Sequence, residues 1–589
     1  MQLDTINENE PCFLGIDVGG TWLKGCSSIL TSKNDGWFPV NFDKMLENIV
    51  RINSPLSEQS TIHDFIASVH QLTEELGIKD KKLDGIGIST CGIVDYAGKQ
   101  VLKAAAHLSV LKSTEWIRNL ENEFNCPVVL INDADAATIG TAELGLLQGD
   151  KTFGIMPIGT GLGFTVWRNN RRWRPGKMLT LLGSIRTPTG FFDTFASASI
   201  LAATDPHNNL TQVLTQPEHS EVRLEYLEKL TKIINTAAII YNLDEVMICG
   251  GLADAVTRCN YPLEKELQTR LDITPVELDK PIRVSVLKEG NSLQLIGAIS
   301  AARGEAVARD NRVQKCYKSI KTEIPYQKEI QLQNMSTEEL IELFWKAEQE
   351  AGELLRNSLP EISRAVDEIS AKIKQGGRLI YVGSGTSGRI AAIDAIEIPC
   401  TYGFPEDRIL CIVSGGIADA SVEIESAFEE DASAVPEMLL MNVQSNDVVI
   451  GISASGTAYY VQSALAFAKD RGAFSVLIQS DSSENELPFC NAIIAMNSGN
   501  EVVAGSTRMK AGTATKKILN FISSAVMIKM GKVVGSYMID MACINHKLIE
   551  RAQDILVILY NIDKDEAYQK LKEANMQLNQ AIINIKESL

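Results

Sequence analysis

Small hydroxyl-bearing residues follow an apolar stretch near residue 380, and they are suited to hold a phosphate group. The apolar stretch, LIYV at 379–382, is typical of a buried parallel strand, and GSGTSGR at 383–389 comes directly after it. A helix-like segment then begins, and the N–H groups at a helix start favour an anion. We therefore predict that Ser384, Thr386 and Ser387 bind the phosphate of a phosphomonoester.

A second stretch of this kind, SASGT at 453–457, follows another apolar run at 448–452. Each of its hydroxyls taken alone would be interpreted as a helix N-cap. Parallel strands, however, end at the same edge of a sheet, which is where α/β proteins bind ligands. We predict that Ser453, Ser455 and Thr457 share the phosphate, with Lys510 of GSTRMK as a cation close to the sugar or the phosphate.

Glu397 lies in the otherwise apolar segment 395–399, AIEIP. One interpretation is a carboxylate at a helix end that reaches solvent. The other is a catalytic acid, buried among apolar neighbours that raise its pKa and facing the cavity of the Ser/Thr stretches. Spacing alone leaves both interpretations open.

Three blocks of this half, at 385–403, 446–458 and 505–541, resemble in order and spacing the signatures of the N-acetylmuramic acid 6-phosphate etherases, which have a sugar-isomerase (SIS) fold. The resemblance covers roughly 322–589. It implies that Glu397 is the acid that helps lactate to leave, and that a second glutamate removes the proton on carbon 2 of the ring-opened sugar. Glu430 fits this second role, Glu429 and Glu425 are alternatives, and a charged helix face is the other interpretation of all three. The flanks of the acid depart from the family, which reads Ser-Glu-Cys-Pro-Pro where this chain reads Ile-Glu-Ile-Pro-Cys at 396–400.

The first half of the chain contains glycine-rich turns that could meet a nucleotide. FLGIDVGGTWLK at 13–24 places an acidic residue beside a Gly-Gly-Thr turn, where a carboxylate can hold magnesium while backbone N–H groups meet phosphates. IGTGLG at 158–163 is a second turn, and VMICGGLA at 246–253 is a strand ending in two glycines that leave room for a flat adenine. Singly, such a turn also has an ordinary explanation, such as a hairpin. The residues predicted to bind the nucleotide are Asp17, which is also the predicted magnesium ligand, Gly19, Gly20, Thr21, Gly159, Thr160, Gly161, Gly250 and Gly251.

Together these turns resemble the sugar kinase/Hsp70/actin superfamily, and within it the ROK sugar kinases, over roughly 13–302. VVLINDADAATIGTAELG at 128–145 resembles the ROK block that contains the general base, which implies that Asp133 takes the proton of a sugar hydroxyl and Asn132 contacts the sugar. An Asx-turn cap is the alternative for Asp133. The stretch 178–190 lacks the Gly-Glu-x-Gly-His block and the zinc-binding cysteines usual in ROK members, so neither ordinary glucose recognition nor a structural zinc is expected. Arg186, or the basic run at 168–177, is a candidate partner for a substrate carboxylate, and a solvated loop is the alternative.

Two α/β patterns in series must position these residues. In the second pattern we expect a helical hairpin at 337–373 and strands at 379–382, 409–413, 448–452, 474–478 and 492–496. The predicted fold is α/β: an actin-like, RNase H-like two-lobed kinase at 1–305, a linker at 306–325, a doubly wound parallel-sheet SIS domain at 326–545 and a C-terminal helical unit at 546–589.

Composition excludes several classes of partner. The 589 residues carry a net charge of -18, which argues against nucleic acid and anionic membranes. No apolar stretch approaches the length of about 18 residues that a membrane-spanning helix needs. The eleven cysteines are scattered without a CxxC pair, as expected for reduced thiols in the cytoplasm.

The two halves together predict a bifunctional enzyme with ATP and Mg²⁺ as cofactors of the kinase half and none for the etherase half. Its expected ligands are an amino sugar and a sugar phosphate, and resemblance to SIS modules implies a homodimer. The alternative is a kinase fused to a non-catalytic sugar-phosphate sensor like the glucokinase regulatory protein.

Overall fold

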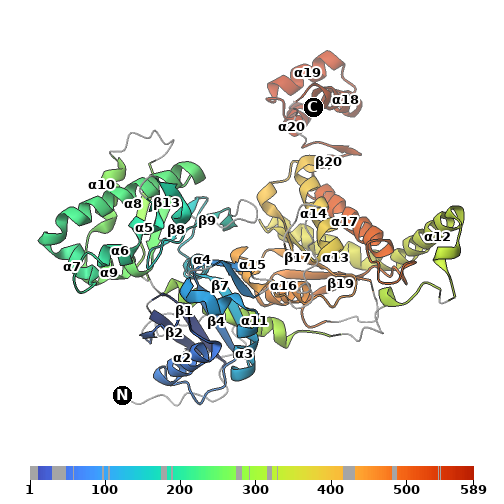
Figure 1. The fold of residues 1–589 in the computed structure, drawn as a ribbon. Helices are drawn as coiled ribbons and strands as arrows, with labels where there is room; N and C mark the ends of the chain where they lie inside the picture. Colours follow the sequence, from blue (N-terminus) through green and yellow to red (C-terminus); the bar gives the residue numbers. More distant parts are fainter. Residues whose placement is uncertain are drawn as a thin grey trace, which may run out of the picture. The chain divides into compact units, whose positions relative to one another are not determined.

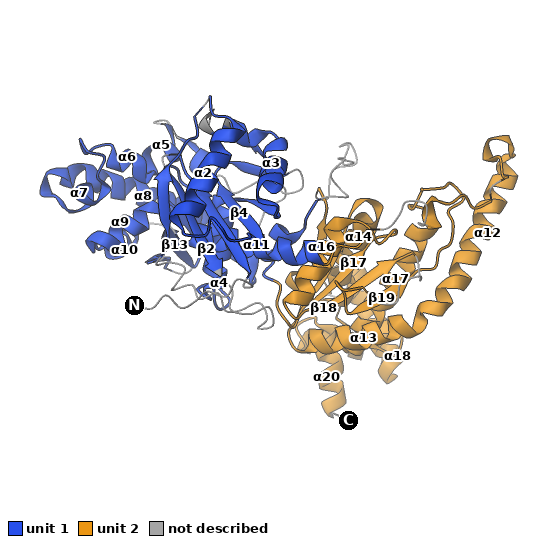
Figure 2. Cartoon of the chain, turned by 90° about the horizontal axis from the view of Figure 1, so that it is seen from below, with its two compact units in different colours: residues 1–310, 432–442 blue, residues 311–431, 443–589 orange. Residues whose placement is uncertain are grey.

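The computed structural model forms two compact units (Figures 1 and 2). The first contains residues 1–310 and 432–442, and the second contains 311–431 and 443–589. The residues that the structure describes are 11–20, 22–29, 48–57, 59–95, 99–103, 106–173, 182–187, 190–272, 281–288, 290, 292–314, 321–327, 329–415, 432–480, 487–540, 543 and 545–588.

The first unit contains two five-stranded sheets, as expected for a two-lobed kinase. The first sheet has the order β3-β2-β1-β4-β7 and the second the order β10-β9-β8-β13-β14. In the first sheet β1 pairs antiparallel with β2 and parallel with β4, so a hairpin and a parallel crossover share one strand. These strands are β1 (Cys12–Val18), β2 (Trp22–Ile29), β3 (Val50–Asn53), β4 (Gly85–Thr90), β7 (Val128–Asn132), β8 (Phe153–Pro157), β9 (Thr165–Arg168), β10 (Arg171–Trp173), β13 (Glu245–Cys249) and β14 (Arg283–Val286).

Helix α11 (Leu293–Asp310) is the central helix of this unit, because it packs on β1, on β4 and on α4 (Asp133–Glu143). The approach is close at Gly87, where an added Cβ would lie 1.8 Å from the carbonyl oxygen of Ala298. Its other helices include α2 (Ile62–Glu75), α3 (Glu115–Phe124), α5 (Asp193–Ala196), α6 (Ala198–Ala202), α7 (Leu210–Thr215), α8 (Ser220–Tyr241), α9 (Gly251–Cys259) and α10 (Leu263–Asp272).

A short helix from the second half of the sequence also belongs to the first unit. Helix α15 (Val435–Leu440) is buried along its length and contacts α11 and α4. Five residues, 443–447, then lead into strand β17 (Val448–Ile452) of the second unit. The chain therefore passes between the two units more than once.

The second unit is built on one parallel sheet of order β16-β15-β17-β18-β19, the doubly wound arrangement that the sequence predicts. Besides β17, its strands are β15 (Leu379–Gly383), β16 (Ile409–Val413), β18 (Phe474–Gln479) and β19 (Ala492–Ala495). Its helices are α12 (Thr337–Leu355), α13 (Leu359–Lys374), α14 (Gly385–Tyr402), α16 (Tyr459–Asp470) and α17 (Lys510–Lys529). The helical hairpin at 337–373 is thus confirmed as α12 and α13.

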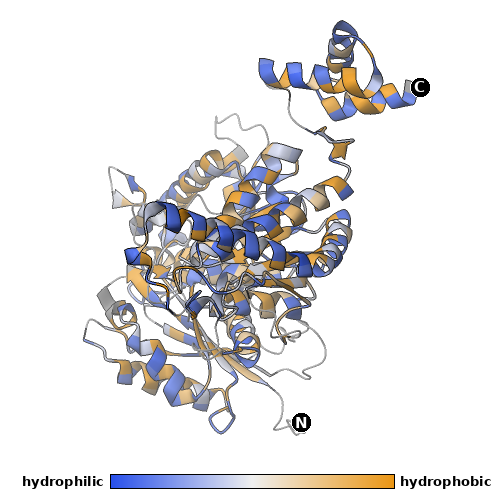
Figure 3. Cartoon of the chain, turned by 90° about the vertical axis from the view of Figure 1, so that its right-hand side faces the viewer, coloured by the Kyte–Doolittle hydropathy of each residue, from blue (hydrophilic) through white to orange (hydrophobic). Residues whose placement is uncertain are grey.

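The C-terminal segment forms a small helical module with its own core. Helices α18 (His546–Tyr560), α19 (Lys564–Glu573) and α20 (Leu578–Ser588) bury a cluster that includes Ile555, Leu571 and Ile582. Each helix carries both hydrophobic and hydrophilic stretches (Figure 3). Among the described residues, no helix is long and apolar enough to cross a membrane.

Candidate active sites

A cavity of about 300 Å³ in the first unit is lined by the glycine-rich turns that the sequence singled out. The predicted residues on its wall are Asp17, Gly19, Gly20, Asp133, Gly159, Thr160, Gly161, Gly250 and Gly251. Thr21 lies outside the described residues, and Asn132 lies one residue before Asp133 at the start of α4. The fold therefore brings together turns that are more than 200 residues apart in the chain.

The glycine turns at 158–163 and 250–251 are joined by backbone hydrogen bonds. The Ile158 N–H donates to the carbonyl oxygen of Cys249 at 2.9 Å, and the Leu252 N–H donates to the carbonyl oxygen of Ile158 at 2.9 Å. Gly250 has φ +83°, and an added Cβ would lie 2.9 Å from the backbone nitrogen of Ile158. Only glycine fits at position 250 without strain, and its missing side chain allows the turn at 250–251 to pack closely against the backbone of Ile158.

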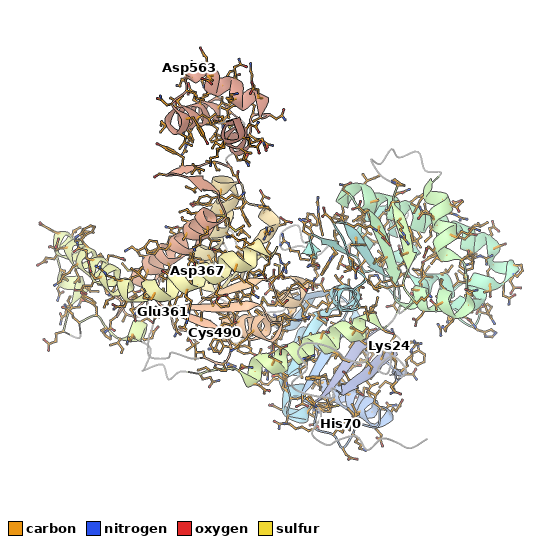
Figure 4. The ribbon with its side chains drawn as sticks, turned by 180° about the vertical axis from the view of Figure 1, so that it is seen from behind. Lys24, His70, Glu361, Asp367, Cys490 and Asp563 are labelled. Carbon is orange, nitrogen blue, oxygen red and sulfur yellow. The ribbon has the colours of Figure 1, made fainter. Side chains whose placement is uncertain are left out.

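Asp17 lies in a row of polar side chains that crosses the first sheet. The register pairs Asp17 with Lys24, Lys24 with Arg51, and Asp17 with Ser89. Lys24 Nζ lies 3.1 Å from Asp17 Oδ2, and the Ser89 hydroxyl donates to Asp17 Oδ1 at 3.1 Å. Lys24 (labelled in Figure 4) and Arg51 also line the cavity. The row gives the cavity two cations that sequence reasoning missed, although Lys24 stands in the quoted FLGIDVGGTWLK motif.

Asp133 opens helix α4, whose N-cap is Asn132. The Asn132 side-chain oxygen accepts the N–H groups of Ala134 and Asp135, so the cap is Asn132 and not Asp133. Asp133 Oδ1 accepts hydrogen bonds from Asn132 Nδ2 at 3.1 Å and from the Ala134 N–H at 2.9 Å. Burial, reinforced by the negative charge of Asp17, raises the pKa of Asp133 to about 7. A carboxyl with this pKa can exchange a proton near neutral pH, as a general base must.

Asp193 is a further acidic residue of this region that the sequence did not reveal. It is the first residue of α5 and accepts a hydrogen bond from the Leu162 N–H, which fixes the turn at 159–163. Burial raises its pKa. An added Cβ on Gly161 would lie 3.0 Å from Asp193 Oδ1, so this carboxyl lies directly behind the glycine turn. No motif surrounds Asp193 in the sequence, and only the fold places it here.

The predicted arginine candidates have different environments. Arg172 is buried and forms an ion pair with the buried Asp135. Arg168 and Arg186 are exposed, and neither lines the cavity. Residues 174–177 lie outside the described residues. Arg168 and Arg172 of the basic run therefore have different environments.

In the second unit the two Ser/Thr stretches lie at the carboxyl ends of neighbouring parallel strands. Ser384 follows β15 and Ser453 follows β17, and these strands pair with Gly383 opposite Ile452. Helix α14 begins at Gly385, so Thr386 and Ser387 lie in its first turn and not in a separate loop. Ser384, its N-cap, makes no side-chain capping hydrogen bond. This helix start therefore has the polar groups that an anion needs.

The second stretch, Ser453–Thr457, is a compact turn. Gly456 has φ +73°, and its N–H donates to Ser453 Oγ at 3.1 Å. The hydroxyls of Ser455 and Thr457 lie 2.6 Å apart and are half-buried. The first turn of α17 lies close to the first Ser/Thr stretch, because an added Cβ on Gly512 would lie 4.0 Å from a methyl carbon of Thr386.

Lys510 is buried, and its contacts are intramolecular. Its ammonium donates to the carbonyl oxygen of Asn500 at 2.9 Å and lies 4.9 Å from the centre of the Tyr326 ring. Burial lowers its pKa, and the carboxylate of Glu501 opposes this effect. Glu501 accepts the N–H groups of Lys510 and Ala511 and so caps α17, a role that the sequence analysis missed. The predicted contact of Lys510 with substrate stays a prediction.

The expectation that Glu397 is buried is wrong for the single chain. Glu397 is exposed on the surface of α14, and its neighbours Ile393 and Ile396 are also exposed, by 51% and 65%. It lies 11 residues after Thr386, which is about 16 Å along the helix axis. The apolar flanks indicated burial in the sequence, but Ile398 is buried whereas helical periodicity places Glu397 with Ile393 on the outward face. Glu425, Glu429 and Glu430 lie outside the described residues.

A larger cavity of about 1200 Å³ lies along β19 in the second unit. Its wall includes Glu361 and Cys490 (both labelled in Figure 4), together with Arg364 and Lys469. It contains none of the predicted site residues. Volume alone therefore does not identify the site in this unit, and the strand ends with their hydroxyls remain the better candidate.

Known proteins of two different families resemble the two halves of the chain. Residues 14–185 match the model of the ROK family, and residues 361–469 match that of the glucokinase regulatory protein N-terminal SIS domain. Over 245 residues the chain is 40% identical to an N-acetylmuramic acid 6-phosphate etherase of Prochlorococcus marinus (strain NATL1A), covering 42% of this chain and 79% of that protein. Over 265 residues it is 37% identical to the N-acetylmuramic acid 6-phosphate etherase of Clostridium beijerinckii (strain ATCC 51743 / NCIMB 8052), covering 45% and 87%. The crystal structure of a ROK family glucokinase from Streptomyces griseus in complex with glucose and AMPPNP is 20% identical, with a TM-score of 0.38, and covers 50% of this chain and 99% of that one.

Proposed function

The chain belongs to the N-acetylmuramic acid 6-phosphate etherase family, and from this membership we propose that it is a bifunctional enzyme of amino-sugar breakdown in peptidoglycan recycling. Its first unit, which contains the ROK family region, phosphorylates the 6-hydroxyl of N-acetylmuramic acid. Its second unit cleaves the lactyl ether of that product with the overall consumption of one water molecule. The products are N-acetylglucosamine 6-phosphate and D-lactate.

The observation that carries the kinase assignment is the convergence of the glycine turns and Asp133 on one cavity. Asp133 accepts the proton of the sugar hydroxyl, and Asn132 holds the Asp133 carboxyl in place. Asp17 is the carboxylate suited to hold Mg²⁺, and the turn N–H groups suit the phosphates of ATP. ATP, when bound, supplies the phosphoryl group. Lys24 and Arg51 add positive charge to the same wall.

The etherase assignment rests on the identity to the family over most of its length. Ser384, Thr386 and Ser387 hold the phosphate together with Ser453, Ser455 and Thr457, because both sets lie at the ends of paired strands. Glu397 is the acid for the departing lactate, and Glu430 is the base that removes the proton from carbon 2. N-acetylmuramic acid is the simplest kinase substrate, because its 6-phosphate is what the second unit consumes.

The exposed position of Glu397 supports a homodimer. Ile393 and Ile396 of α14 and Phe521 and Ile528 of α17 are exposed apolar residues, and these two helices pack together. A second copy that covers this face brings Glu397 of one chain to the Ser/Thr stretches of the other. Mixing the inactive variants Glu397→Gln and Ser455→Glu should then restore up to about a quarter of the activity, because a mixed dimer keeps one intact site. No restoration at equal subunit exchange would contradict this arrangement.

Mass spectrometry of the products made from N-acetylmuramic acid and MgATP by the whole protein tests the proposal. We expect N-acetylglucosamine 6-phosphate and lactate from the wild type. The Asp133→Asn variant should make neither from the free sugar but both from N-acetylmuramic acid 6-phosphate. Preferential phosphorylation of N-acetylglucosamine or glucose would overturn the kinase assignment.

A second candidate function follows from the match of 361–469 to the SIS domain of the glucokinase regulatory protein. On this alternative the second unit binds a sugar phosphate without cleaving it and regulates the kinase of the same chain. Lactate release from N-acetylmuramic acid 6-phosphate distinguishes the two candidates, because a sensor releases none. We also propose a cytoplasmic location, in keeping with the free thiols throughout the described residues.

A further inference from the structure

A buried glutamine, Gln462 of α16, connects the Ser453–Thr457 turn to the segment that follows the kinase helix α11. The Gln462 side chain is 1% exposed. Its amide nitrogen donates to the carbonyl oxygen of Gly456 at 2.7 Å and to that of Val313 at 2.9 Å. Its amide oxygen accepts the Val313 N–H at 3.0 Å. One side chain therefore makes three of the four hydrogen bonds open to an amide.

Val313 lies three residues after Asp310, the last residue of α11. The neighbouring residue Arg312 is also held, because its guanidinium lies 4.6 Å from the centre of the ring of Tyr459, the first residue of α16. Within the predicted linker at 306–325, Arg312 and Val313 are each held by a side chain of α16. The anchoring helix begins directly after the Ser453–Thr457 turn.

The contact with Gly456 determines the shape of the turn. Gly456 has φ +73°, and its N–H bonds back to Ser453. With its N–H held by Ser453 and its carbonyl held by Gln462, the residue between Ser455 and Thr457 has a fixed orientation. Gln462 therefore helps to place both neighbouring hydroxyls through its bond to the Gly456 carbonyl.

We propose that Gln462 is a positioning residue for the etherase step, which holds the phosphate-binding turn in place and is itself anchored on the segment leaving the kinase half. This inference rests on the proposed phosphate-binding role of the turn. It makes the segment around Val313 part of the support of the phosphate-binding turn, because Val313 and Gly456 are bonded to the same side chain. Chain continuity provides a second connection, because α15 belongs to the first unit and leads into β17, which precedes the same turn.

The test is steady-state lactate release from N-acetylmuramic acid 6-phosphate by the full-length protein. Gln462→Leu keeps the volume of the side chain and removes all three hydrogen bonds, so KM should rise roughly tenfold while kcat changes little. Val313→Pro removes the N–H that Gln462 accepts, and also fixes φ and replaces the valine side chain, and KM should rise about fivefold. Ser370→Ala is the matched control, because Ser370 is also buried on a helix but bonds only to Val366, and it should leave KM unchanged.

The double variant separates the anchoring role from general destabilisation. If Gln462 acts through Val313, the double variant Gln462→Leu/Val313→Pro has the KM of Gln462→Leu alone, whereas independent effects multiply. Circular dichroism and thermal unfolding of the same samples show that the variants are folded. An unchanged KM in Gln462→Leu, or multiplied effects in the double variant, would overturn the inference.

Ser455→Ala distinguishes this failure from failure of the proposed function. If Ser455→Ala raises KM and Gln462→Leu does not, the turn binds phosphate and the anchor is unimportant. If Ser455→Ala also leaves KM unchanged, the phosphate-binding role of the turn is refuted and the inference fails with it.

Discussion

The pH dependence of phosphoryl transfer tests the role of Asp133 most directly. Burial and the charge of Asp17 raise the pKa of Asp133 from 3.8 to about 7. Only the carboxylate form can take the proton of a sugar hydroxyl. The fraction in this form rises roughly tenfold between about pH 6 and pH 8 when the pKa is near 7, and the rate constant kcat/KM for the sugar should follow it. An aspartate with an ordinary pKa would be fully ionised over this range and would give a flat profile.

The assay is ADP release by the whole protein with N-acetylmuramic acid as the varied substrate and MgATP held at a low concentration. The low concentration matters because a metal ion beside Asp17 offsets its negative charge and lowers the pKa of Asp133. At saturating MgATP the midpoint of the profile should therefore move to lower pH. Circular dichroism of the same samples at each pH controls for loss of folded protein.

The Asp17→Asn variant isolates the electrostatic cause. It removes the neighbouring charge, so the midpoint should move to lower pH even though the lost metal ligand reduces the overall rate. The Asp133→Asn variant should lose roughly 10²- to 10⁴-fold in rate, as expected for a missing general base. A flat wild-type profile between pH 6 and pH 8, or a midpoint that Asp17→Asn leaves in place, would refute the reasoning.

Other predictions concern stability, assembly and the second reaction. The pKa of Asp133 in the folded chain lies above its unfolded value, so the folded state binds this proton more tightly and the free energy of unfolding falls as pH rises from about 4 to 7. Asp133→Asn should therefore have a higher Tm than the wild type at pH 8. A lower Tm than the wild type at that pH would contradict this. Glu397→Gln should abolish lactate release while sugar-phosphate binding, measured by calorimetry, persists; continued release would exclude Glu397 as the acid. Ile396→Glu should shift the protein to monomers in light scattering, because Ile396 is 65% exposed in the single chain and would face the second copy; an unchanged mass would exclude this face. Asp447→Ala leaves the buried Arg378 guanidinium without its carboxylate, 2.5 Å away, and should cost about 3–5 kcal/mol in urea unfolding; a loss below about 1 kcal/mol would contradict a buried pair.

Elements and turns were predictable because they depend on residues that are neighbours in the chain. Alternation of apolar runs with helical periodicity indicated the parallel sheet of the second unit, and all five of its expected strands are present. The turns at 159–161 and 250–251 were recognised from glycine spacing, since a turn conformation is a local property. The motifs were likewise sufficient to recognise the etherase family. The 40% identity to one of its members over 245 residues confirms that recognition.

What the sequence could not determine is the environment of a side chain, because that depends on residues brought in from elsewhere in the chain. Glu397 has apolar flanks in sequence but lies on an outward face, since consecutive helical residues point in different directions and its neighbour Ile398 takes the buried one. The sequence suggested a ligand contact for Lys510 but could not reveal that its ammonium donates to the carbonyl oxygen of Asn500. Only the tertiary structure places Asp17 near enough to raise the pKa of Asp133, and only it joins Gln462 to Val313 across 149 residues of sequence.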